Sequence, residues 1–184
     1  MSVILDVQKE IQTFQYVSRA IIEGMMIQQG GLNPTLLMLC EKDGQLVPCM
    51  APSIGESYNK ENKDLFRKVV TGIIKELKPV AIAIASEAWM IVKPTKEDVD
   101  FNIPVAEQEG RKEVVCLQFE TYNKAELIVL DIIRNGEKIT LAIDENLSGP
   151  VNKDQTEGTF CNLLNENYER FHKELKETIN KSLN

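Results

Sequence analysis

The carboxylate of Glu87 is the group in this sequence with the clearest potential for chemistry. It lies on one face of a strongly apolar segment, residues 80–92, with apolar residues on either side of it on that face. An unpaired charge buried in such a strand would be costly, so we expect a cationic partner. Arg111, which enters the next apolar segment beside Glu113, is the best-placed candidate in the sequence.

The same residues could instead form a reactive pocket. Glu87, Arg111, Glu113 and Glu120 would line it beneath the polar loop that precedes Arg111, and one carboxylate would act as a base or bind a metal. A metal-assisted hydrolase of the nuclease or phosphoesterase type would use Glu87 with Glu113, Glu120 or Asp131 as oxygen ligands. The usual pairing of an acidic residue with a lysine two positions on is missing from adjacent predicted strands, which argues against this alternative.

An acidic loop within residues 93–112 carries a second, weaker metal pattern. Four oxygen-bearing side chains fall at positions 1, 3, 5 and 12 of a calcium-loop register: Asp98, Asp100, Asn102 and Glu109. Position 6 is Ile103, where the sharp turn of such a loop needs glycine, and the next residue is proline. We therefore expect a solvated loop, and these four residues remain only candidate metal ligands.

Other catalytic and cofactor arrangements are missing from the sequence. His172 is the only histidine, and Cys161, its possible partner, lies eleven residues earlier in the same predicted helix. At 1.5 Å per residue the two side chains would be roughly 16 Å apart, too far to share a proton. No glycine-rich phosphate loop and no zinc-type spacing of Cys and His occurs, so we expect no cofactor.

Composition predicts one soluble domain. The chain has 184 residues, 43% hydrophobic and 27% charged, and its 21 Lys and Arg against 28 Asp and Glu give a net charge of −7. A chain of this length can bury an adequate core without disulfides or metals. The acidic balance, without basic clusters, excludes nucleic acid and anionic membranes as expected partners.

The absence of a long apolar run and of a signal-like N-terminus predicts a cytoplasmic protein. Cysteine usage agrees, because the four cysteines form no C-x-x-C pair and lie mostly in apolar runs: Cys40, Cys49, Cys116 and Cys161. We expect them to be buried thiols.

Hydrophobic periodicity predicts the elements that position these residues. Apolar residues from Ile4 to Met25 recur every three or four positions, with Ser18 in the one gap, which indicates an amphipathic helix ending at Gly30-Gly31. A β-hairpin follows, over residues 35–40 and 46–50 with its turn at Asp43-Gly44. With this two-residue loop, Cys40 should pair with Val47 and Cys49 with Met38, so we expect the two cysteines to be diagonal. Pro48 cannot donate to a ladder, so its strand should be an edge or bulged.

The same hydrophobic periodicity predicts the remaining helices and strands. Residues 59–78 predict a helix whose core face contains Leu65, Phe66, Val69, Ile73 and Leu77, and residues 80–92 predict a central strand. Three antiparallel strands at 114–119, 127–133 and 139–143 come next, followed by a last amphipathic helix.

This order predicts an α+β fold with a single, mostly antiparallel sheet of about five strands and helices packed on it. The order is α-β-β-α-β-β-β(-β)-α, and by analogy the topology is similar to the roadblock, longin and profilin-like folds. We expect a domain over residues 1–145, a linker over 146–158, and a C-terminal helix over 159–184 that packs on the domain or on a partner.

One resemblance concerns residues 34–135. The predicted helix and strand up to Met90, ending in Ser86-Glu87-Ala88-Trp89-Met90, and the later Arg111-Lys112-Glu113 resemble uncharacterised prokaryotic and phage-associated proteins. In that group a Ser-Glu-Ala-Trp strand precedes a strand opened by Arg-x-Glu. The resemblance implies an intact domain and brings no known activity with it.

We expect a non-enzymatic, cytoplasmic interaction or regulatory protein. Its terminal helices carry apolar stripes that one small sheet would not fully cover, which predicts self-association, as in a dimer, or a protein partner. The metal-assisted hydrolase described above is the alternative, and a sensor of a small ligand is a third possibility.

Overall fold

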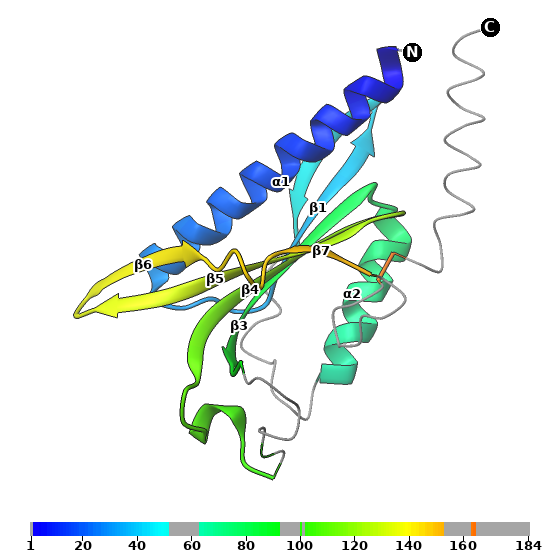
Figure 1. The fold of residues 1–184 in the computed structure, drawn as a ribbon. Coiled ribbons are helices and arrows are strands. Elements are labelled where there is room, and N and C mark those ends of the chain that lie inside the picture. The colour runs from blue at the N-terminus through cyan, green and yellow to red at the C-terminus, as the bar shows by residue number, and fades with distance from the viewer. Residues whose placement is uncertain (1, 52–62, 93–99, 101, 153–162, 165–184) are drawn as a thin grey trace, which may run out of the picture.

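The computed structural model describes residues 2–51, 63–92, 100, 102–152 and 163–164, with side chains described from residue 7 in the first helix and from residue 65 in the second. Over these residues the fold is α+β, as expected, with two α-helices on opposite sides of an antiparallel, curled sheet (Figure 1). The elements are α1 (Ser2–Gln29), β1 (Thr35–Lys42), β2 (Gln45–Met50), α2 (Lys63–Leu77), β3 (Ala81–Met90), the short 3₁₀-helix η3 (Val105–Glu107), β4 (Lys112–Thr121), β5 (Ala125–Asn135), β6 (Lys138–Ile143) and β7 (Gly149–Val151).

Within the described part of the chain the sheet has seven strands rather than about five. Its order is β2-β1-β3-β4-β5-β6, and β7 pairs with β5. β7 comes from the segment expected to be a linker, and it forms because β5 is longer than β6: β6 pairs with the second half of β5, and β7 with its first three residues. The expected division into domains remains a prediction.

A tight turn joins β6 to β7 along the same edge of β5. The side chain of Asp144 accepts hydrogen bonds from the backbone N–H groups of Asn146 (3.0 Å) and Leu147 (3.3 Å). Ser148 Oγ accepts the N–H of Val129 at 2.9 Å, in place of a ladder bond. One chain segment therefore covers nearly the whole of β5.

The hairpin of β1 and β2 has the predicted turn and register. Asp43 and Gly44 both have positive φ (53° and 77°), the combination that a two-residue type I′ turn requires. Cys40 pairs with Val47 and Cys49 with Met38, so the two cysteines are diagonal, as expected. Within the described residues β2 is an edge strand, which confirms the position predicted for Pro48.

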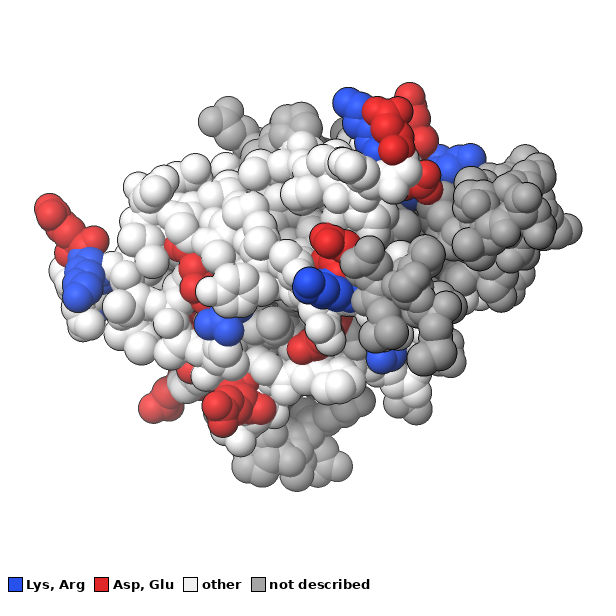
Figure 2. Space-filling view, turned by 90° about the horizontal axis from the view of Figure 1, so that it is seen from above, with Lys and Arg blue, Asp and Glu red and all other residues white. Residues whose placement is uncertain are grey.

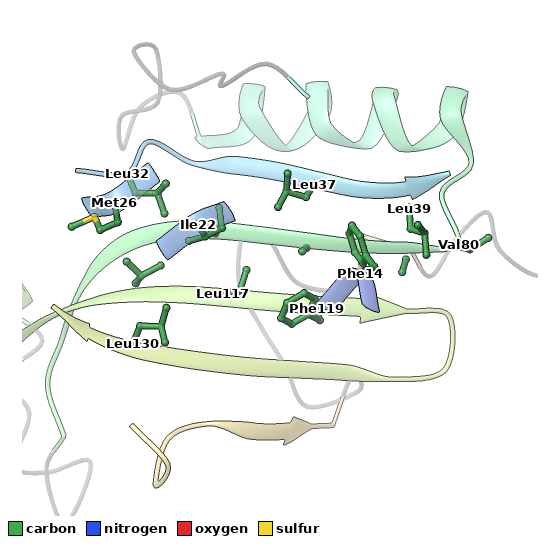
Figure 3. Close-up of a cluster of buried hydrophobic side chains, with 14 of the residues drawn as sticks. Phe14, Ile22, Met26, Leu32, Leu37, Leu39, Val80, Leu117, Phe119 and Leu130 are labelled. Carbon is green, nitrogen blue, oxygen red and sulfur yellow. The ribbon is translucent and has the colours of Figure 1, made fainter. Parts of the chain in front are cut away.

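Helix α1 packs on one face of the sheet, against the small side chains of β3. The alanines at 81, 83 and 85 are buried in one cluster with Phe14, Ile22 and Met26 of α1 and with residues of β1, β4 and β5 (Figure 3). Ile22 and Met26 are fully buried, whereas Met25, the last residue of the predicted stripe, is only partly covered. The core stripe of α1 advances by four residues at each step, through Phe14, Ser18, Ile22 and Met26.

Helix α2 covers part of the other face, but with a different side from the one predicted. Phe66, Val70 and Ile74 are buried against β1 and β3, whereas Leu65, Val69 and Leu77 are exposed. The prediction of Leu65, Val69 and Leu77 as core residues was wrong, because apolar residues occupy more than one side of this helix and periodicity does not choose between them. The helix ends at Leu77, and the next residue, Lys78, has a φ of +46° and is followed by Pro79.

Several sequence predictions lie outside the described residues. They are the C-terminal helix apart from 163–164, the start of the helix expected from 59, His172, Cys161 and Asp98. Among the described residues, no helix is long and apolar enough to cross a membrane.

Candidate functional site

A hydrogen bond to Glu87 holds the connection between α1 and β1 against the sheet. Its Oε1 accepts a hydrogen bond from the backbone N–H of Leu32. A Cβ built on Gly31 would lie 3.3 Å from the same oxygen, so the chain passes close to the carboxylate where a glycine stands. Glu87 therefore has a backbone donor as a partner, a possibility that no pattern in the sequence indicated.

The cation beside Glu87 is Arg134 rather than Arg111. Arg134 Nε and Nη2 each donate to the carboxylate of Glu113 at 2.8 Å, and Arg134 Nη1 donates to the Gly30 carbonyl at 3.0 Å. The hydrogen bonds from Arg134 hold the pKa of Glu113 below its usual value, and Glu113 and Glu87 help to raise the pKa of Arg134. A guanidinium at the C-terminal end of α1 also complements the helix dipole.

Arg111 contacts a different group. Its guanidinium carbon lies 5.4 Å from the centre of the Trp89 ring, a cation–π geometry, and its Nη1 donates to the Gln108 carbonyl at 3.2 Å. Trp89 keeps 47% of its surface exposed. Arg111 therefore forms a cation–π contact with Trp89 instead of the predicted ion pair with Glu87. Glu87 already accepts a hydrogen bond from Leu32 and lies near Arg134.

Glu120 lies on the opposite face of the sheet from Glu87. Val115 pairs with Glu87, and Glu120 is five residues further along β4, an odd number that places it on the other side. Its side chain is 1% exposed. Oε2 accepts the backbone N–H groups of Leu163 (3.0 Å) and Leu164 (3.3 Å), and Oε1 accepts Nε2 of Gln118 (2.7 Å).

Leu163 and Leu164 are themselves buried, in the cluster under α2. That cluster also contains the thiol of Cys40, whose pKa is raised to about 11 by burial and by the neighbouring Cys49. Glu120 therefore ties two residues from the far end of the chain to the sheet face that carries Cys40.

Asp131 shares the face of Glu120 but belongs to another group. Lys112 Nζ lies 2.8 Å from Asp131 Oδ1 and also forms an ion pair with Asp144. Burial acts to lower the pKa of Lys112, but hydrogen bonds to the two aspartates more than offset it and raise the pKa. Lys112 lowers the pKa of Asp144 in turn. Asp131 pairs with Val114, six residues and roughly 20 Å along β4 from Glu120.

The described part of the acidic loop is held by its own hydrogen bonds. Asp100 Oδ1 accepts the backbone N–H (2.9 Å) and the side-chain amide (3.1 Å) of Asn102. Gln108 Nε2 donates to the carbonyls of Asp100 and Ile103, at 2.8 Å in each case. Glu109 is exposed.

The structure thus brings together only two of the four predicted pocket residues. Glu87 and Glu113 are diagonal neighbours on the face of α1, joined through Arg134, whereas Arg111 contacts Trp89 and Glu120 lies across the sheet. Among the residues that the structure describes, no three His, Cys, Asp or Glu side chains are grouped so that they could hold a metal ion. Glu87 and Glu120 hold backbone segments against the sheet, and the Arg134–Glu113 pair joins two neighbouring strands.

The feature that sequence reasoning missed is the outward face of α1. Six residues on this side carry no charge, and we call them the outer face: Thr13, Tyr16, Val17, Ala20, Gly24 and Ile27. At 3.6 residues per turn they point about 170° away from the core stripe. Tyr16 is 77% and Ile27 55% exposed.

Arg19 and Glu23, the charged residues within the length of the outer face, lie along one flank of it. Arg19 Nε contacts Glu23 Oε1 at 2.6 Å, one turn away on the same helix. Figure 2 shows the molecule from above, with charged side chains separated by broad uncharged areas. The missed signal was present in the sequence, since no charged residue other than this pair occurs from residue 11 to residue 40.

Comparison of the chain with protein-family models, with curated proteins and with solved structures gave no match.

Proposed function

We propose that this protein is a non-enzymatic cytoplasmic interaction protein, and that the outer face of α1 is the surface through which it binds a protein. The supporting observation is the absence of charge from the outer face over four turns of a helix whose opposite side is already buried in the core. A helix that is apolar on both sides is normally covered on both sides.

The composition of the outer face also suits a protein interface. Tyrosine is enriched at interface centres because it offers a large, rigid surface with a polar end. Tyr16 and Ile27 are the most exposed large apolar side chains in the described part of α1, and Ala20 and Gly24 between them leave room for another backbone to approach closely. In Figure 1 no other labelled element lies outside α1 on this side of the molecule.

The analogy to the roadblock, longin and profilin-like topologies belongs to this proposal as a likeness of element order, and it assigns no partner. The metal-assisted hydrolase receives no support from the carboxylates described above, because Glu87 and Glu120 lie on opposite faces of the sheet.

Photo-cross-linking tests the proposed function in the cells that make the protein. A photoreactive amino acid replaces Val17 on the outer face, and in a matched control it replaces Lys138, which is exposed at the start of β6. We expect a discrete protein adduct from position 17 that is missing from position 138. Equal, diffuse labelling from both positions would contradict the proposal.

A further inference from the structure

We propose that three sulfur-bearing side chains of the hairpin of β1 and β2 bind a soft monovalent metal ion: the thiolates of Cys40 and Cys49, with the thioether of Met38 as a third ligand. Copper(I) is the biological ion of this class, and silver(I) is its redox-inert equivalent as a probe. The site lies on the face of the sheet that carries α2, so it is separate from the outer face of α1 and goes beyond the proposed function.

The register of the hairpin places the three residues together. Met38 and Cys40 are two positions apart on β1 and therefore lie on the same face. Cys49 of β2 is directly opposite Met38 and diagonal to Cys40. In such a ladder the Cα atoms of the direct pair are about 5.5 Å apart and those of the diagonal pair about 7–8 Å. Met38 and Cys40 are buried in one cluster, and Cys49 packs against it.

The thiols of Cys40 and Cys49 interact in the folded protein. Burial raises the pKa of Cys40 to about 11, and the charge of the Cys49 thiol and a hydrogen bond with it add to the increase. A thiol has this influence only at close range, so the two sulfur atoms lie near one another.

The diagonal spacing suits a bridging metal ion better than a disulfide. A disulfide holds its Cα atoms about 4.4–6.8 Å apart and its sulfurs about 2 Å apart, so this pair could not close one without backbone movement. Metal–thiolate bonds are about 2.3 Å long, so a linear sulfur–metal–sulfur unit spans roughly 4.6 Å.

The number and kind of ligands select the ion. Two thiolates and a thioether are soft ligands, which favour copper(I) over the hard cations that oxygen atoms bind. Zinc takes four ligands in structural sites, and in the part of the chain that the structure describes no three His, Cys, Asp or Glu side chains are grouped to contribute them. Copper(I) and silver(I) accept two or three sulfur ligands.

The surroundings provide an entry path and an apolar shell. Cys49 is half-buried on β2, an edge strand within the described residues, whereas Cys40 and Met38 are buried, so an ion reaches Cys49 first. Apolar residues of α2 belong to the same cluster and limit the access of water: Phe66, Val70 and Ile74.

Binding exchanges two protons for one ion. Each thiol loses its S–H proton to solvent and donates a sulfur electron pair to the metal. One monovalent cation and two thiols therefore give a complex with one net negative charge and two released protons. Lys42, the next residue on this face of β1, is exposed and supplies a positive charge at that end of the site.

Titration of the full chain with silver(I) tests the site. Cys116→Ser and Cys161→Ser are combined, so that Cys40 and Cys49 are the only thiols left. We expect one ion per chain, release of two protons for each ion, and joint protection of both thiols from alkylation. Copper(I), added under anaerobic conditions, should compete for the same site. The matched control combines Cys40→Ser with Cys49→Ser, retains the other two thiols, and should lack this two-proton binding.

Single substitutions separate the roles of the ligands. Cys49→Ser should weaken silver(I) binding by more than the roughly 10- to 100-fold that loss of an outer-shell partner costs. Met38→Leu nearly conserves the side-chain volume and keeps both thiols, and it should weaken binding about tenfold. X-ray absorption at the silver edge should show three sulfur neighbours in the parent chain and two in Met38→Leu.

Silver(I) binding that releases a single proton per ion, or that Cys49→Ser leaves unchanged, would overturn the site. The proton count is made with both thiols in place, so it decides the question even where Cys49→Ser fails to fold. Nitrogen or oxygen neighbours in place of the two thiolates would also overturn the site, and identical spectra from the parent chain and Met38→Leu would overturn the role of the thioether.

Discussion

Substitution of Glu120 tests whether this buried carboxylate holds the Leu163–Leu164 segment on the sheet. Glu120→Ala removes the acceptor of three hydrogen bonds and leaves two backbone N–H groups near an apolar cluster. Hydrogen bonds to a charged group contribute about 1.5–3 kcal/mol each, and such contributions are not additive within one network. We expect Glu120→Ala to lower the free energy of unfolding by about 2–4 kcal/mol, unless the segment detaches first.

Glu120→Gln separates the loss of charge from the loss of the acceptor. The glutamine oxygen can still accept the N–H groups of Leu163 and Leu164, and the side-chain amide of Gln118 can turn to present its oxygen to the new NH₂ group. We therefore expect a smaller loss, about 1 kcal/mol. Glu41→Ala, at an exposed glutamate on β1, is the matched control and should change stability by less than about 0.5 kcal/mol.

Cys40 reports the position of the segment directly, because it is buried in the cluster that contains Leu163 and Leu164. Detachment would expose its thiol, and a change of about 1.4–2.8 kcal/mol in the free energy of local opening would speed its alkylation about 10- to 100-fold. Alkylation of each cysteine is followed by mass spectrometry alongside urea unfolding. Cys116, which is partly exposed on the same face four residues from Glu120 along β4, is the comparison thiol outside the cluster.

The reasoning would be refuted if Glu120→Ala left both the urea midpoint and the alkylation rate of Cys40 within error of the wild type. Faster alkylation of Cys40 with unchanged Cys116 would locate the effect in the segment. Faster alkylation of both would indicate that Glu120 supports the whole sheet.

Four further outcomes are expected. Ser18→Ala should raise stability by about 1 kcal/mol in thermal unfolding, because the Ser18 hydroxyl is 1% exposed and has no hydrogen-bond partner in the described part of the structure; Thr13→Ala, where the hydroxyl is bonded and exposed, should give no such gain. Arg134→Ala should lower stability by about 1 kcal/mol at pH 7, a modest figure because the pair is partly exposed. Because the pKa of Glu113 is lowered in the folded protein, the stabilisation by the Arg134–Glu113 pair is fully present above about pH 4.3, the pKa in the unfolded chain. It disappears as the pH falls through the pKa of Glu113 in the folded protein, so the urea midpoints of the variant and the wild type should converge in acid. Gly31→Ala should destabilise the protein because its Cβ would meet Glu87 Oε1 at 3.3 Å, and a double-mutant cycle with Glu87→Ala should show that the cost largely disappears. Above about pH 9 stability should fall, as the buried thiol of Cys40, with its pKa raised to about 11, begins to ionise more readily in the unfolded chain, and Cys40→Ala should flatten that part of the pH profile.

The features that sequence predicted well are those fixed by neighbouring residues. The turn at Asp43-Gly44 determines the register of β1 and β2, so the diagonal placement of Cys40 and Cys49 could be worked out without a structure. The strongly apolar segment 80–92 likewise identified a central strand, and residues of β3 are buried in clusters on both faces of the sheet.

The partners of the polar groups were harder to predict from the sequence, because they come from segments far away along the chain. Arg134 is 47 residues from Glu87 along the chain, and about twenty residues of loop separate β3 from β4, so no local pattern fixes which carboxylate meets which cation. One error was avoidable: Glu113 and Glu120 are seven residues apart on one strand, and an odd separation already places them on opposite faces. The hydrogen bond from the Leu163 N–H to Glu120 joins residues 43 positions apart, and no sequence pattern predicts it.

The register of the hairpin has a consequence for how copies of this chain can assemble. The Ala51 N–H bonds to the Leu36 carbonyl, so pairs with an even-numbered residue of β1 are the hydrogen-bonded ones, and Pro48, opposite Leu39, directs its ring nitrogen away from β1. A strand added at the outer edge of β2 would find no donor at that position. Growth by strand addition, which has no natural end, is thereby hindered at this edge of the sheet.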